Sequence, residues 1–335
     1  MILDKILDFL YPKIFINIIA SNAQSTVFVE TISKGKILSS EEEIFSTGTL
    51  NTKMIDYIKK FINQTPYYYI SILDKSLDQG LIPTCSDLKK YVENPANIST
   101  ICEEKKHMYY TSQYDLKELQ RDYKSIGLDF VFSPFSILNK FFADKIDDNL
   151  AIFLLIEHRT ISLSIFNKSK LLFSQYLNVE DDMSSDSLSM DGHLDDEISL
   201  EIDGINLDDI DVDDDVSSLE DFSDIEDLDT GLEIDEFSED EDIEEITNHH
   251  DNIEIESDEF NEDYKRFILI QESINTFYKD DKYDSEFIEN IYIADAIGTS
   301  KDLKKYLEEE MFLSVIIRKV DLAQELCDMA KAELQ

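Results

Sequence analysis

The segment KIFINIIASNAQSTVFVETISKGKIL, residues 13–38, decides the fold class of this 335-residue chain. Apolar and β-branched residues fill two runs, at 13–22 and 25–32, and a third run begins at Ile37. The turn Lys34-Gly35-Lys36 separates the second run from the third, which is typical of a β-hairpin. The segment therefore predicts three consecutive strands.

The same pattern returns near residue 150, in LAIFLLIEHRTISLSIFNKSKLLFSQYL (150–177). Aligned without gaps at an offset of 134, TISKGKIL (31–38) lies over IFNKSKLL (165–172), and the turn lysines of the two hairpins coincide. The strand before each hairpin also matches. Because a repeated pattern indicates internal duplication, two similar halves are expected.

Helices and further strands follow each group of three strands. Apolar residues recur at helical spacing, and helices are expected at 52–63, 114–125, after Pro134, at 264–278, at 299–307 with Ser300 as N-cap, and at 321–334. Further strands are expected at YYYISILD (67–74), FVF (130–132), IENIYIADAIG (288–298) and FLSVIIRKV (312–320). This alternation of strand and helix predicts an α/β fold with parallel pairing.

The acidic charge of the chain is concentrated in one segment. The chain has 74 acidic and 30 basic residues and a net charge of −44. Residues 180–263 contain 38 of the acidic residues and no Lys or Arg, which leaves 36 acidic against 30 basic elsewhere, or −6. A nearly neutral fold interrupted by a long disordered acidic insertion is therefore expected. Nucleic-acid binding is not expected, because it requires clustered positive charge.

Cysteine usage and the absence of long apolar runs in the sequence indicate a cytoplasmic protein. Cys85, Cys102 and Cys327 are odd in number and far apart, which predicts a reducing compartment and no disulfide framework. The first 13 residues lack the pattern of a signal peptide, and no run is apolar enough to span a membrane. Residues 2–10 could form a short amphipathic helix that packs on the core or docks on a membrane surface.

The layout resembles the actin-like ATPase superfamily, in which two ribonuclease H-like lobes each open with a strand, a phosphate loop and a hairpin. More narrowly, it is similar to PilM of type IV pilus assembly, to the cytoplasmic part of GspL and to FtsA. The segments that carry the resemblance are 13–30, 127–142, 150–166 and 291–315. The resemblance implies a first lobe at 1–145, a second lobe at 146–179 and 264–335, and the disordered acidic insert at 180–263.

The nucleotide loops of this family require glycine, because backbone amides must approach phosphates closely. The chain has eight Gly, of which Gly192, Gly204 and Gly231 lie in the insert. The resemblance puts Asn17 where a metal-orienting Asp belongs. The vestigial nucleotide pocket would then consist of Asn17, Ser21, Asn22, Glu157, His158, Asp295 and Gly298. Hydrolysis is expected to be lost, with no catalytic residue and no cofactor; bound ATP with Mg²⁺ is the alternative.

Other candidate sites are weaker. Glu157-His158-Arg159 is interpreted as an exposed turn between two strands, with a catalytic cluster as the alternative. His249-His250 and the acidic run at 211–215 lack the ligand geometry of a zinc or calcium site, so no metal is expected. No histidine–acid pattern supports a catalytic thiol at Cys85 or Cys102.

The resemblance implies a non-catalytic cytoplasmic scaffold of an envelope-spanning machine, such as a type IV pilus, a type II secretion apparatus or a flagellar motor. It would be peripheral to the inner membrane through a PilN-like inner-membrane assembly protein, and a ring-type homo-oligomer is a further expectation. One alternative is a nucleotide-binding, PilM-like ATPase switch. Another is an acidic adaptor whose insert at 180–263 captures a basic protein partner, rather than acting as a spacer.

Overall fold

The computed structural model describes residues 11–92, 94–103, 106–179, 250–283, 285–299 and 301–334, with side chains omitted for 250–261. The chain divides into a unit formed by Met1–Met183 and Asp251–Gln335 and a unit formed by Ser184–His250. Residues 1–10 and 180–249 lie outside the described part, and so do Ser300 and the acidic run at 211–215. The predicted disorder of the insert and the predicted helix at the start of the chain therefore stay predictions.

Five strands form the first sheet, and three of them come from the opening segment. Their order across the sheet is β3 (Lys36–Phe45), β2 (Ser25–Ser33), β1 (Lys13–Ala20), β4 (Tyr68–Leu73) and β8 (Phe130–Phe132). β1, β2 and β3 pair antiparallel, whereas β4 runs parallel to β1 and β8 runs parallel to β4.

The second sheet repeats this arrangement. Its order is β11 (Lys170–Asn178), β10 (Thr160–Asn167), β9 (Ala151–Ile156), β12 (Asn290–Asp295) and β13 (Ser314–Lys319). Again the first three strands of the chain order pair antiparallel, and the last two are parallel to the first. The predicted α/β fold, a duplicated actin-like arrangement, is therefore confirmed.

The duplication extends to the details of the hairpins. Both turns have positive φ at two central residues, Lys34 (54°) with Gly35 (71°) and Lys168 (48°) with Ser169 (66°), as expected for a tight hairpin turn. Each hairpin also has an irregular register, after Thr31 in the first and after Ile165 in the second. Since 31 + 134 = 165, the irregularities occupy equivalent positions.

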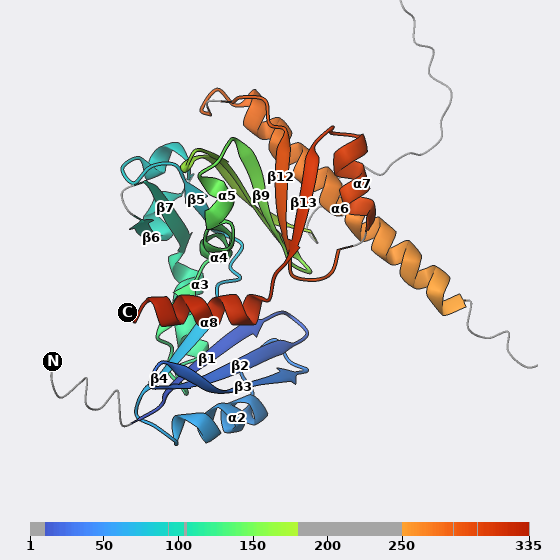
Figure 1. Ribbon diagram of the computed structural model, residues 1–335. Helices are drawn as coiled ribbons and strands as arrows, with labels where there is room; N and C mark the ends of the chain where they lie inside the picture. The colour runs from blue at the N-terminus through green and yellow to red at the C-terminus, as the bar shows by residue number, and fades with distance from the viewer. Residues whose placement is uncertain are drawn as a thin grey trace, which may run out of the picture. The chain divides into compact units, whose positions relative to one another are not determined.

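The first sheet is covered by one helix on each face (Figure 1). α2 (Thr52–Ile62) begins with Asn51, whose side chain accepts from the Met54 amide at 2.9 Å, and it packs on the face formed by Ile14, Ile16 and Ile18. α8 (Leu322–Ala332) packs on the opposite face, together with Phe15 and Phe28. Successive side chains of β1 point to opposite faces of the sheet, so this strand contributes apolar residues to the contacts with both helices.

The position of α8 differs from the lobe boundaries expected from the sequence. Residues 264–335 were all expected in the second lobe, yet α8 contacts β1, β2 and β4 of the first sheet. Lys331 on this helix donates to Glu30 on β2 at 2.8 Å. A helical pattern shows which face of α8 is apolar but not which sheet that face will meet, so the sequence could not show this contact.

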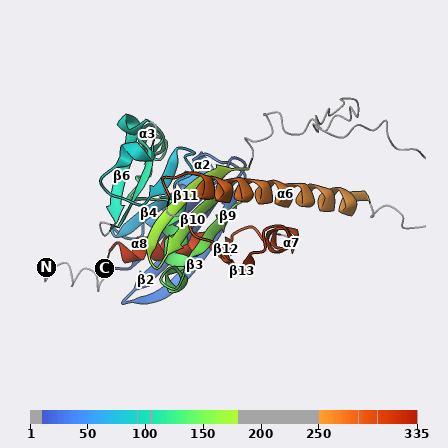
Figure 2. The ribbon, with the colours of Figure 1, turned by 90° about the horizontal axis from the view of Figure 1, so that it is seen from above.

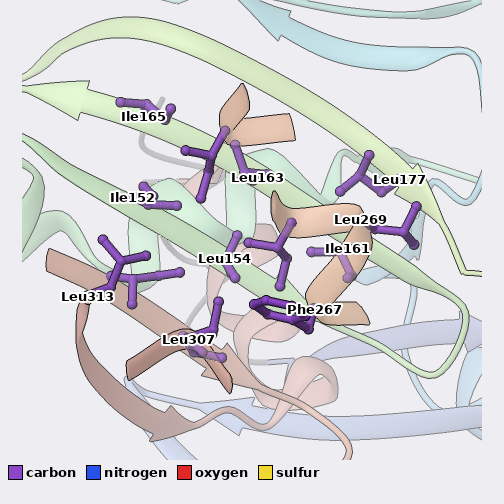
Figure 3. Close-up of a cluster of buried hydrophobic side chains, with 14 of the residues drawn as sticks. Ile152, Leu154, Ile161, Leu163, Ile165, Leu177, Phe267, Leu269, Leu307 and Leu313 are labelled. Carbon is purple, nitrogen blue, oxygen red and sulfur yellow. The ribbon is translucent and has the colours of Figure 1, made fainter. Parts of the chain in front are cut away.

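One face of the second sheet is covered by α6 (His250–Lys279) and α7 (Lys301–Glu309), as Figure 2 shows from above. Figure 3 shows the core between them, where Phe267 and Leu269 of α6 and Leu307 of α7 meet Leu154, Ile161 and Leu163. The predicted helix starts at Tyr264, whereas α6 begins at His250. Its first residues therefore lie in the segment that was expected to be disordered.

A smaller sheet, in the order β5 (Gln79–Ile82), β7 (His107–Ser112) and β6 (Ile98–Glu103), packs next to β11. The remaining helices are α3 (Gln113–Asp122), α4 (Pro134–Phe141) and α5 (Ala143–Ile146), with short 3₁₀ turns at Leu88–Lys90 and Pro95–Asn97. Among the helices of the described residues, none combines the length and apolarity needed to cross a membrane.

Cys85 and Cys102 form a disulfide bond beside this small sheet, so the expectation that the chain has no disulfide is wrong. The two residues are 17 positions apart in sequence, but the loop after β5 and strand β6 bring their Cα atoms to 5.6 Å. That separation is within the range that a disulfide requires. Cys327 is a buried free thiol on α8.

Candidate functional site

A cleft of about 650 Å³ lies where the carboxyl ends of parallel strands from both large sheets come together. Such strand ends are the usual place for ligands in α/β folds. The cleft is lined by residues at or just beyond the ends of β1, β4, β9, β12 and β13. Among them are Ser21, Asn22, Lys75, Glu157, His158, Ala296, Ile297, Lys319 and Asp321.

Glu157 is at the end of β9, where the second phosphate loop was expected. Its carboxylate is buried, with 6% of the residue exposed, and it forms an ion pair with Lys75, the second residue after β4. Burial lowers the pKa of the Lys75 ammonium to about 7, and the Asp74 carboxylate opposes that shift. The pair therefore joins the strand ends of the first sheet to those of the second.

The turn Glu157-His158-Arg159 connects β9 to β10, as expected, but only part of it is exposed. His158 is exposed, whereas Glu157 is buried, so the expectation of a fully exposed turn is wrong for Glu157. A buried carboxylate needs a partner, and Lys75 supplies it. The His158 carbonyl accepts from the guanidinium of Arg266 on α6 at 3.3 Å, which fixes the turn.

Arg266 itself is only 3% exposed, and two carboxylates also accept hydrogen bonds from it. It donates to Asp263 at 2.8 Å and to Glu262 at 2.7 Å, both on the same helix. Sequence reasoning missed Arg266, because an Asp-Arg spacing of three on a helix is also common in exposed ion pairs.

The third segment, after β12, forms a closed turn around Asp295. This carboxylate accepts from the amides of Ile297 (3.0 Å), Gly298 (2.9 Å) and Thr299 (2.8 Å), and from the Thr299 hydroxyl (3.1 Å). Gly298 adopts a φ of +81°, a conformation that glycine accepts without strain. The amides of this turn thus already have an anionic partner.

The start of α8 is closed in the same way. Asp321 lines the cleft and accepts from the amides of Ala323 and Gln324, both at 3.0 Å. A helix N-terminus is a common anion-binding site, but here a carboxylate of the chain occupies it.

The first loop is closed by its own hydrogen bonds and by close packing. The Ser21 amide donates to the Gln24 carbonyl at 2.8 Å, and the Ser21 hydroxyl bonds to the same residue. A Cβ atom at Gly48 would lie 2.1 Å from the Ser21 carbonyl oxygen. Gly48 therefore lets a second backbone segment pack directly against the loop.

The seven predicted pocket residues are only partly brought together. Ser21, Asn22, Glu157 and His158 line the cleft, and Asp295 and Gly298 bracket its lining residues Ala296 and Ile297.

Asn17 does not line it. Its side chain is fully buried within the first sheet, where it donates to the Phe28 carbonyl at 3.3 Å and accepts from Ser71 at 2.6 Å. The residue expected to orient a metal is therefore part of the sheet packing.

Sequence reasoning missed Lys75, Lys319 and Asp321, which line the cleft. A usable signal was present, since each lies at or just beyond the carboxyl end of a strand that the sequence predicted. Within the residues that the structure describes, no group of three or more His, Cys, Asp or Glu side chains has the arrangement of a metal site.

Comparison with known protein families gives two matches. A family model described as a domain of unknown function (DUF8341) matches residues 152–335, and a second such domain (DUF8569) matches residues 11–139. None of the curated proteins matches the chain.

Comparison with solved structures gives matches of low sequence identity. A Bacteroides thetaiotaomicron protein with an actin-like ATPase fold and unknown function is 9% identical, has a TM-score of 0.43, and is matched over 94% of this chain and 96% of that one. The PilM–PilN type IV pilus biogenesis complex is 11% identical, has a TM-score of 0.46, and is matched over 94% of this chain and 89% of that one. The Aquifex aeolicus PPX-GPPA enzyme is 11% identical, has a TM-score of 0.25, and is matched over 50% of this chain and 52% of that one. The fold itself is established by the two strand orders.

Proposed function

The chain belongs to the family described as a domain of unknown function, DUF8341, and we propose that it acts as a non-catalytic actin-like scaffold. In this proposal the cleft is a structural joint between the two large sheets, and it does not hydrolyse nucleotide. The protein would present fixed surfaces to the components of an envelope-spanning machine.

The observation that supports this most directly is that carboxylates of the chain occupy the donors that a phosphate would need. Asp295 accepts hydrogen bonds from the amides of the third turn, and Asp321 accepts from the first amides of α8. Glu157 forms an ion pair with Lys75. Phosphate binding depends on available amides and cations. A nucleotide would have to displace these carboxylates. Glu157 and Asp295 are buried, and an unpaired buried charge costs several kcal/mol.

A fixed shape is a second support for a scaffold. Besides the Lys75–Glu157 pair, Arg318 of β13 donates to Asp144 of α5 through two bonds of 3.0 Å. Glu30 of β2 pairs with Lys331 of α8, and the Glu30 side chain is only 1% exposed. The Lys75–Glu157 pair connects the two large sheets, and the Glu30–Lys331 pair fixes α8 on the first sheet. A fixed arrangement of this kind opposes the opening and closing that a nucleotide cycle requires.

For the partner, the resemblance of the sequence layout to PilM suggests a cytoplasmic segment of a PilN-like inner-membrane assembly protein. The protein would then be cytoplasmic and peripheral to the inner membrane through that partner, in a pilus-type, secretion-type or flagellar machine. Affinity purification from the native cell tests this. Recovery of an inner-membrane assembly protein would support the proposal, and recovery of soluble proteins alone would contradict it.

A second candidate, nucleotide binding without turnover, is favoured by the size and charge of the cleft. Its volume of about 650 Å³ is typical of ligand sites, and Lys75, Arg159 and Lys319 line it. Calorimetric titration with Mg-ATP and Mg-ADP separates the two candidates.

The scaffold proposal expects no binding up to millimolar nucleotide and no phosphate release. Thermal unfolding of the same sample serves as the control that the protein is folded. Micromolar binding would contradict the scaffold in its present form and favour the second candidate, and phosphate release would contradict both.

A further inference from the structure

The two most exposed aromatic side chains in the described part of the chain lie at one end of the second sheet. Phe312 is 83% exposed and Phe287 is 76% exposed. Phe287 precedes β12 and Phe312 precedes β13, and these parallel strands begin side by side, with the Ser314 amide donating to the Glu289 carbonyl at 2.7 Å. Both rings are therefore near the amino ends of the strands, the end away from the cleft. Exposed aromatic groups at one place indicate an interaction site.

Phe312 also has an unusual backbone conformation. Its φ is +56°, in the left-handed region, which is unfavourable for a bulky side chain. The other non-glycine residues with positive φ in the described ranges are Lys34, Lys168 and Ser169, all in tight hairpin turns. Strain of this kind is typical of functional positions.

The adjacent strand β13 is an edge that is open to pairing. It has a neighbouring strand on one side only, and Ile316 and Ile317 are 38% and 36% exposed, one on each face. Exposed edges of this kind accept a further strand from another chain.

The other sheet edges differ from β13. β3 carries Glu41, Glu42 and Glu43, which discourage pairing, and β8 is only three residues long. β11 is covered by β5, where the Leu81 amide donates to Ser174 at 3.2 Å. The charges of β13 are at its carboxyl end, where Arg318 pairs with Asp144 and Lys319 lines the cleft. Among the edges of the two large sheets, the first half of β13 is therefore the one best suited to accept a strand.

The charge around the two rings identifies the kind of partner. Glu286 and Glu289 are exposed on either side of the Phe287 segment, and Glu308, Glu309 and Glu310 are exposed just before Phe312. α7 ends at Glu309 without a basic residue in its last turn. Carboxylates at a helix C-terminus are unfavourable because that end carries partial negative charge. Lys304 pairs with Glu308 at 3.5 Å, and a cationic partner would relieve the repulsion among the other carboxylates.

We propose that this surface, the Phe287–Phe312 edge, binds an extended basic segment of a partner protein as an additional strand on β13. The edge consists of Phe287, Phe312, Ile316 and Ile317 with the glutamates 308–310. Apolar side chains on one face of the segment would contact the rings and the isoleucine on that face, and its Lys or Arg residues would meet the glutamates. The site is independent of the cleft, so it can fail while the scaffold proposal stands.

The test uses the full chain and a short synthetic peptide of alternating lysine and valine that carries one tryptophan. The chain has no Trp, so tryptophan anisotropy reports on the peptide alone. Hydrogen exchange measured with and without peptide then locates the bound segment. The amides of Ser314 and Val320 donate towards β12, so those of the odd-numbered residues 315, 317 and 319 point away from it. The expected result is peptide-dependent protection of these outward-facing β13 amides.

The decisive variant is Phe312→Gly. Glycine accepts the positive φ, so the variant should fold at least as well as the wild type, yet protection of β13 should disappear and affinity for that site should fall about tenfold or more. Replacing Glu308, Glu309 and Glu310 by Gln should weaken binding and reduce its dependence on salt. Ile44→Ser on the β3 edge is the matched control and should change nothing.

Three results would overturn the proposal. The peptide could bind without protecting β13 and equally to wild type and F312G, which would mean that the acidic residues at 180–263 alone capture it. The outward-facing β13 amides could already be protected in a monomeric sample without peptide, which would mean that the chain covers its own edge. They could be protected only in a dimer seen by sedimentation, in which case the occupant is a second copy.

Discussion

Asp295 illustrates at the level of one residue how this cleft differs from a phosphate site. Its two oxygens accept four hydrogen bonds from residues 297–299, and only 6% of the residue is exposed. In a phosphate loop the ligand supplies the anion, and here the protein does. The turn is therefore complete without a ligand.

Replacing Asp295 should show how strongly the turn depends on it. Asp295→Ala leaves the amides of a partly buried turn without their acceptor, so the free energy of unfolding should fall by about 1–3 kcal/mol in a urea titration. Asp295→Asn keeps one acceptor and should lose less. The exposed Asp281→Ala is the control, with a change within about 0.5 kcal/mol. Wild-type stability of D295A would show that the carboxylate is not the partner of these amides.

At the level of elements, the sequence predicted the helices and strands whose apolar residues follow a clear local periodicity. The hairpins before β3 and β11 were predictable because β-branched runs surround turn residues, and even the bulge positions follow the offset of 134. α2 was predictable from its apolar spacing and its cap at Asn51. The small sheet was missed, because its strands mix Cys, Tyr, Thr and Ser without clear alternation.

The candidate site was predictable only in part, for a physical reason. Loop positions could be assigned from strand order, so Ser21, Asn22, Glu157 and His158 were found. Contacts between distant segments could not be predicted. Lys75 is 82 residues from Glu157, and no local sequence pattern indicates their ion pair. Asn17 was misplaced because sequence alone did not show which face of β1 meets the cleft.

The disulfide between the loop after β5 and β6 gives a test at the level of elements. Purified, non-reduced protein should show one reactive thiol when denatured and three after reduction. In the folded state even that one should react slowly, because burial raises the pKa of Cys327 from 9.0 to about 12. Thiolate at pH 8 is then about 1000-fold scarcer than for an ordinary thiol.

Alkylation with mass spectrometry gives these counts, and three thiols before reduction would contradict the bond. The same method applied to acid-quenched cells tests the proposed cytoplasmic location. In a reducing cytosol Cys85 and Cys102 should be labelled, with the bond forming after exposure to air. A bond already present in the cell would argue for an oxidising compartment.

At the level of the whole molecule, the net charge and the fold belong to different parts of the chain. Residues 184–249 contain 28 acidic residues and no Lys or Arg, so their removal changes the net charge from −44 to −16. All three described sheets belong to the unit formed by Met1–Met183 and Asp251–Gln335. The start of α6 at His250 fixes where a deletion has to end, since a cut at residue 263 would remove part of this helix.

Replacing residues 184–249 by a flexible Gly-Ser linker of about 12 residues should therefore leave a cooperatively folding protein. A shorter loop has a smaller closure entropy, so the free energy of unfolding should rise by about 1–2 kcal/mol, measured by urea titration. If the acidic segment serves as a spacer, affinity purification should recover the same partners from both forms. If it captures a basic protein, that protein alone should be lost. A deletion form that no longer unfolds cooperatively would show that residues 184–249 contribute to the fold, and the separation of charge from fold would be wrong.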